Sequence, residues 1–134
     1  MAQEHAAIVE AFAAYERSVR DGRYYEAHED LEAIWYPRRF EDDDEVRLWK
    51  GFINAAVSFE LIRRKRPEPS RKAWQTYRKY FDRLGLIETP HYPLYVTIAE
   101  MLEAVRYELT ADKSCKQEEE YVRVFGGDGV SSRV

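Results

Sequence analysis

The sequence predicts an all-α fold, a compact bundle of about five helices followed by a short irregular C-terminal tail. Apolar residues recur at intervals of three and four positions in five segments, which is the period of one helix face. Glycine, proline or polar turns separate these segments. Hydrophobic residues make up 45% of the 134 residues and charged residues 34%, which is typical of packed helices with solvated faces. We expect one helical domain over residues 1–110 and an extension over residues 111–134.

The first two helices are predicted over residues 4–20 and 23–36. Asp21-Gly22 provides the turn between them, and Pro37 ends the second helix because proline cannot donate a backbone hydrogen bond. The apolar face of the first helix consists of Ile8, Phe12, Tyr15 and Val19. The apolar face of the second consists of Tyr24, Ala27, Leu31, Ile34 and Trp35. Both helices are therefore amphipathic.

A third helix, over residues 44–65, is the most apolar segment, and we expect it to be central. Asp42 and Glu45 have the spacing of a capping box at its start. Gly51 costs about 1 kcal/mol relative to alanine inside a helix, so we expect the second helix to approach the backbone there. The basic run Arg63 to Arg66 complements the negative end of the helix dipole. We interpret this run as a helix terminus, with anion or RNA binding as the minor alternative.

The remaining helices are predicted over residues 70–84 and 94–110. Ser70 is placed to cap the fourth helix and Gly85 to stop it. Two prolines in the segment 89–93 make a stiff connection to the fifth helix. Beyond residue 110 the chain turns polar, with one small apolar cluster at Tyr121, Val122, Val124 and Phe125. We expect this cluster to pack on the bundle and the last residues to be flexible.

Charge and composition argue against several classes of function. The formal net charge of −4 argues against nucleic-acid binding over a whole face, which needs a basic field. No apolar run approaches the length of about 18 residues that a membrane span needs, so we expect no membrane association. Cys115 is the only cysteine, so we expect no intramolecular disulfide and a cytoplasmic location. The remaining partner classes are a small ligand, another protein or a second copy of the chain.

One constellation of side chains is suited to chemistry. His28, Glu32 and Trp35 follow one another at helical spacing along one side of the second helix, with Tyr25 beside Glu32. The third helix carries two polar side chains at the same spacing, Asn54 and Ser58, in an otherwise apolar segment. We expect the two sets to face each other across the helices, with Trp35 and tyrosines as walls.

Three interpretations of this constellation are open. The first is a buried hydrogen-bond network that fixes helix register, and the second is a metal site. The third is a general base, Glu32 or His28, whose pKa is shifted toward neutrality by the other residue. A metal site needs more than His28 and Glu32, and the candidates for a third ligand are Glu29, Asp30, His91 or a carboxylate from another helix. The base would require a pocket that reaches solvent beside Trp35.

Known catalytic patterns are absent from the sequence. His-Glu-x-x-His fails because residue 32 is glutamate, and the paired Glu-x-x-His motifs of di-iron bundles are missing. No glycine-rich phosphate loop or nucleotide-cofactor fingerprint is present, so we expect no nucleotide cofactor. These observations do not decide whether the protein is an enzyme.

Two blocks of sequence resemble a known family. Residues 25–35, Tyr-Glu-Ala-His-Glu-Asp-Leu-Glu-Ala-Ile-Trp, resemble the His-x-x-x-Glu-x-x-Trp/Tyr signature of the domain of unknown function 309 family. Residues 51–56, Gly-Phe-Ile-Asn-Ala-Ala, resemble its second block, and the similarity runs from about residue 15 to residue 80. The resemblance implies a small helical bundle that binds metal, with His28, Glu32 and Trp35 as marked positions and Asn54 near them.

The chain departs from the family pattern in one loop. Where the family often carries Gly-Asn and a later Gly-Ala after the central helix, residues 64–70 read Arg-Lys-Arg-Pro-Glu-Pro-Ser.

The leading functional hypothesis is a site for a divalent metal of unknown identity, or for a small ligand, between the second and third helices. The alternative is a structural or protein-interaction module in which His28, Glu32 and Trp35 form a buried core network.

Overall fold

The computed structural model describes the backbone of residues 2–118 and the side chains of residues 3–111. Over this range the chain forms five α-helices, two short 3₁₀ turns and no strand, which confirms the predicted all-α bundle. The helices are α1 (Ala2–Arg20), α2 (Tyr24–Trp35), α3 (Asp44–Arg63), α4 (Pro67–Phe81) and α5 (Tyr92–Glu118). The 3₁₀ turns are η1 (Tyr36–Arg38) and η2 (Leu84–Leu86). None of the described helices combines the length and the hydrophobicity that a membrane span requires.

The chain divides into two units, Met1–Ala99 and Glu100–Val134. The first holds α1 to α4 and the start of α5, and every site discussed below lies within it. In the second unit α5 continues to Glu118, beyond the predicted helix end near residue 110. The apolar cluster predicted at residues 121–125 lies outside the described residues.

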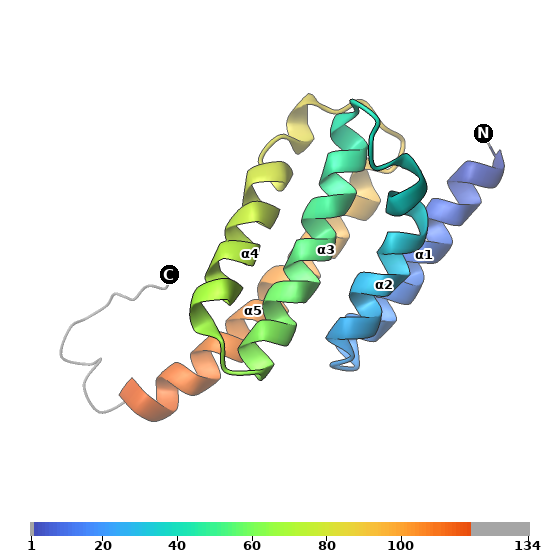
Figure 1. Cartoon of the computed structure of the whole chain (residues 1–134). Helices are drawn as coiled ribbons and strands as arrows, with labels where there is room; N and C mark the ends of the chain where they lie inside the picture. Colours follow the sequence, from blue (N-terminus) through green and yellow to red (C-terminus); the bar gives the residue numbers. More distant parts are fainter. Residues whose placement is uncertain (1, 119–134) are drawn as a thin grey trace. The chain divides into compact units, whose positions relative to one another are not determined.

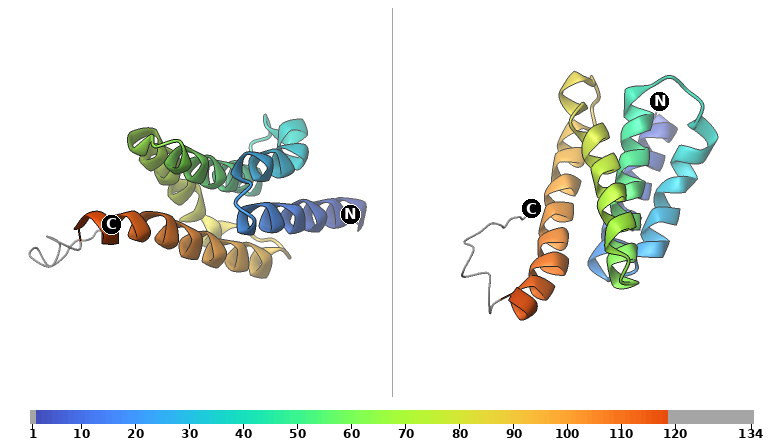
Figure 2. Two further views of the ribbon diagram at one scale, coloured as in Figure 1. Left: turned by 90° about the horizontal axis from the view of Figure 1, so that it is seen from below. Right: turned by 60° about the vertical axis from the view of Figure 1, so that its left-hand side comes forward.

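Helix α3 is the centre of the first unit, as its apolar sequence predicts. It packs against α2 on one side and α4 on the other (Figure 1), and α2 in turn packs on α1. The views in Figure 2 show the same order of these four helices. Phe52 of α3 is fully buried, with ring centroids 5.4 Å from Phe12, 5.7 Å from Tyr77 and 5.8 Å from Tyr95. Aromatic packing around this residue forms the core.

The start of α3 is capped one residue later than the sequence predicts. Asp43 has extended backbone geometry, and its carboxylate accepts hydrogen bonds from the backbone N–H groups of Glu45 (2.7 Å) and Val46 (3.2 Å). The predicted capping box of Asp42 and Glu45 is therefore wrong. Aspartate is a favoured cap residue, so the sequence offers Asp42 and Asp43, and it is the Asp43 carboxylate that accepts from the first N–H groups of the helix.

Helix α4 begins at Pro67, and the predicted cap at Ser70 is also wrong. Proline suits the first turn of a helix because its φ is already set and its missing N–H is not needed there. Ser70 is buried within the helix, and its hydroxyl donates a hydrogen bond to the Ser58 carbonyl (2.9 Å). This serine therefore joins α4 to α3.

Gly51 is a close-contact position, but with α4 and not with the predicted α2. A Cβ atom on this residue would lie 3.0 Å from the Tyr80 Cβ and 3.5 Å from the Tyr77 carbonyl oxygen. Contacts of 3.4–4 Å are ordinary, so a side chain here would press on α4. The absence of a side chain at Gly51 lets α3 and α4 approach.

Candidate functional site

The predicted pair of His28 and Glu32 lies on α2 and is open to solvent on one side. The side chain of His28 is 18% exposed and that of Glu32 is 41% exposed. The pair is therefore half-buried and not sealed in the core. Tyr25, predicted to lie beside it, packs its ring on the imidazole with centroids 4.9 Å apart.

Hydrogen bonding fixes the tautomer of neutral His28. Its Nδ1 atom lies 2.7 Å from the Tyr25 carbonyl oxygen. Because a carbonyl can only accept, Nδ1 carries the proton and donates it. The lone pair of a neutral imidazole is then on Nε2, which lies 3.5 Å from the Glu32 Oε2 atom. Two electron-rich atoms thus face each other across this gap.

Asn54 and Ser58 do not join this pair. Asn54 Nδ2 donates to the Lys50 carbonyl (3.0 Å) and the Ser58 hydroxyl to the Ala55 carbonyl (2.7 Å), both within α3. Side chains of these types reach carbonyls three or four residues earlier in their own helix. Among the described side chains, no hydrogen bond or ion pair links either residue to His28 or Glu32. The predicted polar network between α2 and α3 is not formed by such bonds.

Two of the residues considered as third metal ligands, Asp30 and His91, have other partners, and Glu29 is an exposed residue of α2. Asp30 accepts a hydrogen bond from the Ser18 hydroxyl (2.8 Å), which ties α2 to α1. His91 pairs with His5, with Nε2 and Nδ1 2.8 Å apart. Within residues 3–111, no three or more His, Cys, Asp and Glu side chains are grouped to hold a metal ion. Of the described residues, His28 and Glu32 are the two that offer donors at the α2 pair.

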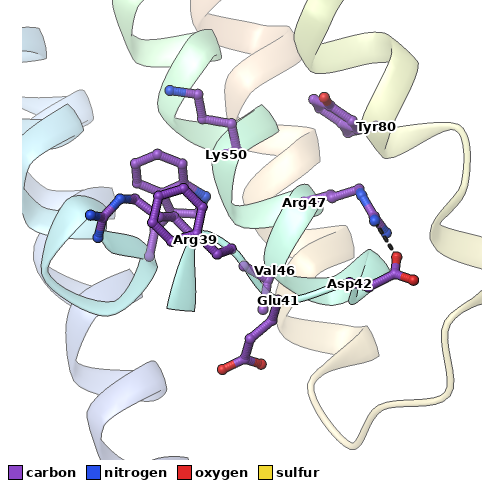
Figure 3. A pocket seen from close by; sticks show the side chains of 9 residues that line it. Arg39, Glu41, Asp42, Val46, Arg47, Lys50 and Tyr80 are labelled. Carbon is purple, nitrogen blue, oxygen red and sulfur yellow. Dashed lines mark hydrogen bonds and ion pairs between the residues drawn. The ribbon is translucent and has the colours of Figure 1, made fainter. Parts of the chain in front are cut away.

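Trp35, the third marked residue, lines an open pocket of about 490 Å³ (Figure 3). Its volume falls within the usual range for small-molecule sites. The lining residues are Trp35, Arg39, Phe40, Glu41, Asp42, Val46, Arg47, Lys50 and Tyr80. They come from the end of α2, the connection to α3, the start of α3 and the end of α4. His28 and Glu32 are not among them.

The acidic residues of this pocket are paired with neighbouring arginines. Glu41 accepts hydrogen bonds from Arg38 at 2.8 Å and 3.0 Å, and these lower the pKa of its carboxyl. Asp42 pairs with Arg47, and this hydrogen bond raises the pKa of the Arg47 guanidinium (Figure 3).

Two other cations in the pocket lie over aromatic rings. Lys50 Nζ is 4.4 Å from the Trp35 ring centroid. The Arg39 guanidinium carbon is 3.5 Å from the Tyr36 centroid and 4.4 Å from the Phe40 centroid. No carboxylate oxygen of the described side chains lies within 4.0 Å of a Lys50 or Arg39 nitrogen. Lys50 and Arg39 are therefore cations without a carboxylate partner among the described side chains.

Sequence reasoning missed a second polar cluster, centred on the Glu45 carboxylate. This carboxylate accepts hydrogen bonds from the Tyr95 hydroxyl and from Thr89 (2.8 Å), and Trp49 Nε1 donates to the Tyr95 oxygen (2.9 Å). His91 Nδ1 lies 3.4 Å from the same Glu45 oxygen. Burial, and then the bond to Glu45, raise the pKa of the Tyr95 phenol. The partners are too distant in sequence for a spacing rule to detect them.

Comparison with protein-family models gives a match for part of the chain. No curated protein and no solved structure matches the chain. The model of the family described as "Domain of unknown function (DUF309)" matches residues 12–73, a segment that includes α2, α3 and the residues His28, Glu32 and Trp35. Over this segment the chain is therefore similar to the DUF309 family, as its two sequence blocks predict.

Proposed function

We propose that this protein binds a divalent metal ion through His28 and Glu32, with the remaining coordination positions open to water or to a small ligand. One observation carries the proposal. The Nε2 lone pair of His28 and the Glu32 carboxylate face each other at 3.5 Å, and the other imidazole nitrogen is held by a backbone carbonyl. Metal-binding histidines are typically oriented by such a bond.

The 3.5 Å gap suits a metal ion better than a proton. Good hydrogen bonds to imidazole span about 2.7–3.2 Å, so a shared proton would be bound weakly at this separation. With metal–ligand bonds of about 2.1 Å, atoms 3.5 Å apart subtend about 113° at the metal. This angle is close to tetrahedral. One imidazole nitrogen and one carboxylate oxygen are donors that zinc, manganese, nickel and iron accept.

Exposure of the pair supports an open site. Glu32 is 41% exposed, so an ion can enter from solvent without any movement of the core. Metal sites that act on ligands keep at least one position free, whereas structural zinc sites use four protein ligands. A site with two protein donors leaves more coordination positions free than a catalytic or a structural zinc site does. We therefore expect it to bind its ion reversibly.

The test is zinc binding by untagged protein, followed by metal analysis after gel filtration and by melting temperature. Wild type is compared with His28→Ala and Glu32→Gln. We expect zinc to raise the melting temperature of wild type, since a ligand at about 100 times its Kd adds about 2.7 kcal/mol of stability. Both variants should lose this shift.

The chain provides a matched control because His5 and His91 form a pair of imidazoles away from α2. The variant His5→Ala removes a histidine of that pair and leaves α2 intact. If zinc binds at the proposed site, His5→Ala retains the shift. A shift lost in His5→Ala but retained in His28→Ala would move the site to the other pair. Absence of any shift in wild type would refute metal binding.

Protein interaction is the second candidate function, and one observation favours it. Three large aromatic side chains are strongly exposed, one at the start of α2 and two just after its end: Tyr25 (54%), Tyr36 (56%) and Phe40 (87%). Aromatic residues are enriched in protein interfaces. If zinc has no effect, we expect sedimentation or a pull-down to detect an assembly that Phe40→Ser weakens.

A further inference from the structure

The geometry points to a second binding site, in which the pocket beside Trp35 takes a small aromatic molecule that carries a carboxylate or phosphate group. This site is separate from the proposed metal site, since neither His28 nor Glu32 lines it. Two features of the lining carry the inference. They are two cations without a carboxylate partner, Lys50 and Arg39, and its aromatic surfaces.

Lys50 and Arg39 are the two lining cations that no carboxylate of the described side chains approaches within 4.0 Å. The lining contains three cations and two acids, and both acids are already paired with Arg38 or Arg47. Lys50 has three N–H donors, and its ammonium contacts only the face of Trp35 among the described groups. An oxyanion is the ligand group that would satisfy these donors.

Arg39 is positioned before any ligand arrives. One of its nitrogens donates to the Tyr36 carbonyl (2.6 Å), and its guanidinium lies over two rings. Only one of its five N–H donors is used by that bond. A cation that is already ordered loses less entropy when it binds an anion.

The aromatic surfaces account for a ring in the ligand. Trp35, Phe40 and Tyr80 all line the pocket, and Phe40 is 87% exposed. Figure 3 shows Lys50 and Arg47 extending from α3, with Tyr80 on α4 beside them. Planar ligands gain binding energy by stacking on such rings. The combination of ring surfaces and cations selects an aromatic oxyanion over an aliphatic one.

Trp35 provides the signal for a direct test. The chain has three tryptophans, and Trp49 (1% exposed) and Trp74 (8%) are buried, whereas Trp35 is half-buried at the pocket. Titration of ¹⁵N-labelled protein with phenylacetate should therefore shift the Trp35 indole N–H resonance and leave the other two in place. The variant Trp35→Phe assigns that resonance.

Three further probes separate charge from stacking. Phenylacetamide has the ring without the charge, acetate has the charge without the ring, and phenyl phosphate replaces the carboxylate by phosphate. We expect phenylacetate or phenyl phosphate to bind at least about tenfold more tightly than phenylacetamide or acetate. Removal of one charged hydrogen bond is expected to weaken binding by about this factor. Whichever of phenylacetate and phenyl phosphate binds more tightly shows whether the pocket prefers a carboxylate or a phosphate group.

Two variants test the cations, and a matched variant controls for the removal of a lysine. Lys50→Met and Arg39→Gln should each weaken phenylacetate binding about tenfold. Lys72→Met, an exposed residue of α4 outside the pocket, should bind as wild type does. Unshifted Trp49 and Trp74 resonances in the variants report an intact fold.

The proposal is overturned by any of three results. The first is equal affinity for phenylacetamide and phenylacetate, and the second is an equal loss of phenylacetate affinity in Lys50→Met and Lys72→Met. The third is the absence of a Trp35 shift with any anion at about 5 mM, a concentration at which even weak sites are occupied. His28→Ala should leave phenylacetate binding unchanged, so failure of the metal proposal and failure of this one are distinguishable.

Discussion

Replacing Gly51 by alanine tests the close approach of α3 and α4. Two effects oppose each other. Alanine favours the helical conformation over glycine by about 1 kcal/mol. The new Cβ atom, however, would lie 3.0 Å from the Tyr80 Cβ, which is backbone-attached and cannot rotate away. Helix α4 must therefore move or α3 must bend.

The magnitude follows from these two terms. Overpacking of a well-filled core costs about 1–3 kcal/mol. Subtraction of the helix-propensity gain of about 1 kcal/mol leaves a net loss of about 1 kcal/mol for Gly51→Ala. For a domain of this size that loss lowers the melting temperature by about 4 °C. Gly51→Val, which adds two more carbons at the same point, should cost more.

The assay is thermal unfolding followed by circular dichroism, with Gly85→Ala as the matched control. No atom lies within 4 Å of a Cβ built on Gly85, so this variant should be neutral or more stable by about 0.4–1 kcal/mol. If Gly51→Ala is stabilised as much as Gly85→Ala, the two helices are not in the tight contact described and the reasoning fails.

Two further predictions concern the buried tyrosines. Tyr95→Phe leaves the buried Trp49 N–H without its acceptor and removes a donor from Glu45, so chemical denaturation should show a loss of about 1–3 kcal/mol. The exposed control Tyr92→Phe should show almost none, and similar losses in both would contradict the network. Burial raises the pKa of Tyr15 and, with the bond to Glu45, that of Tyr95. When the pKa of a phenol is raised in the folded state, its full contribution to stability is present below a pH of about 10. This contribution is lost as the pH rises further, because the phenol of the unfolded chain releases its proton first. Tyrosinate absorbance should therefore rise in two phases, the later one coincident with the loss of helical circular dichroism. Titration of all tyrosines in one phase while the helices persist would refute this.

The helices were predictable because their signal is local. The apolar face of α1, from Ile8 to Val19, repeats every turn, and each of its residues is buried in the structure. Helix ends were less predictable because several signals compete within a few residues. Asp42 and Asp43 are chemically equal as caps, and Pro67 and Ser70 both mark a helix start. Only the backbone conformation at each position decides between them.

Contacts between helices were the least predictable part. The glycine at position 51 indicates that another helix approaches, but its sequence neighbours do not say which one. His28 and Glu32 could be paired from their spacing, since they share one helix. The stacking of Lys50 on Trp35 depends on the packing of α2 against α3, which no local pattern encodes. The motif on α2 was therefore readable, whereas the pocket beside it was not.

The Glu45 carboxylate has a consequence for how this sequence can change during evolution. Its oxygen Oε2 accepts bonds from two hydroxyl groups, and one of these is also the acceptor for a buried indole. An apolar residue at position 45 would leave these donors without an acceptor, and a phenylalanine at position 95 would do the same to the Trp49 N–H. Related sequences should therefore exchange positions 45, 49 and 95 together, so that coevolution joins the start of α3 to the start of α5.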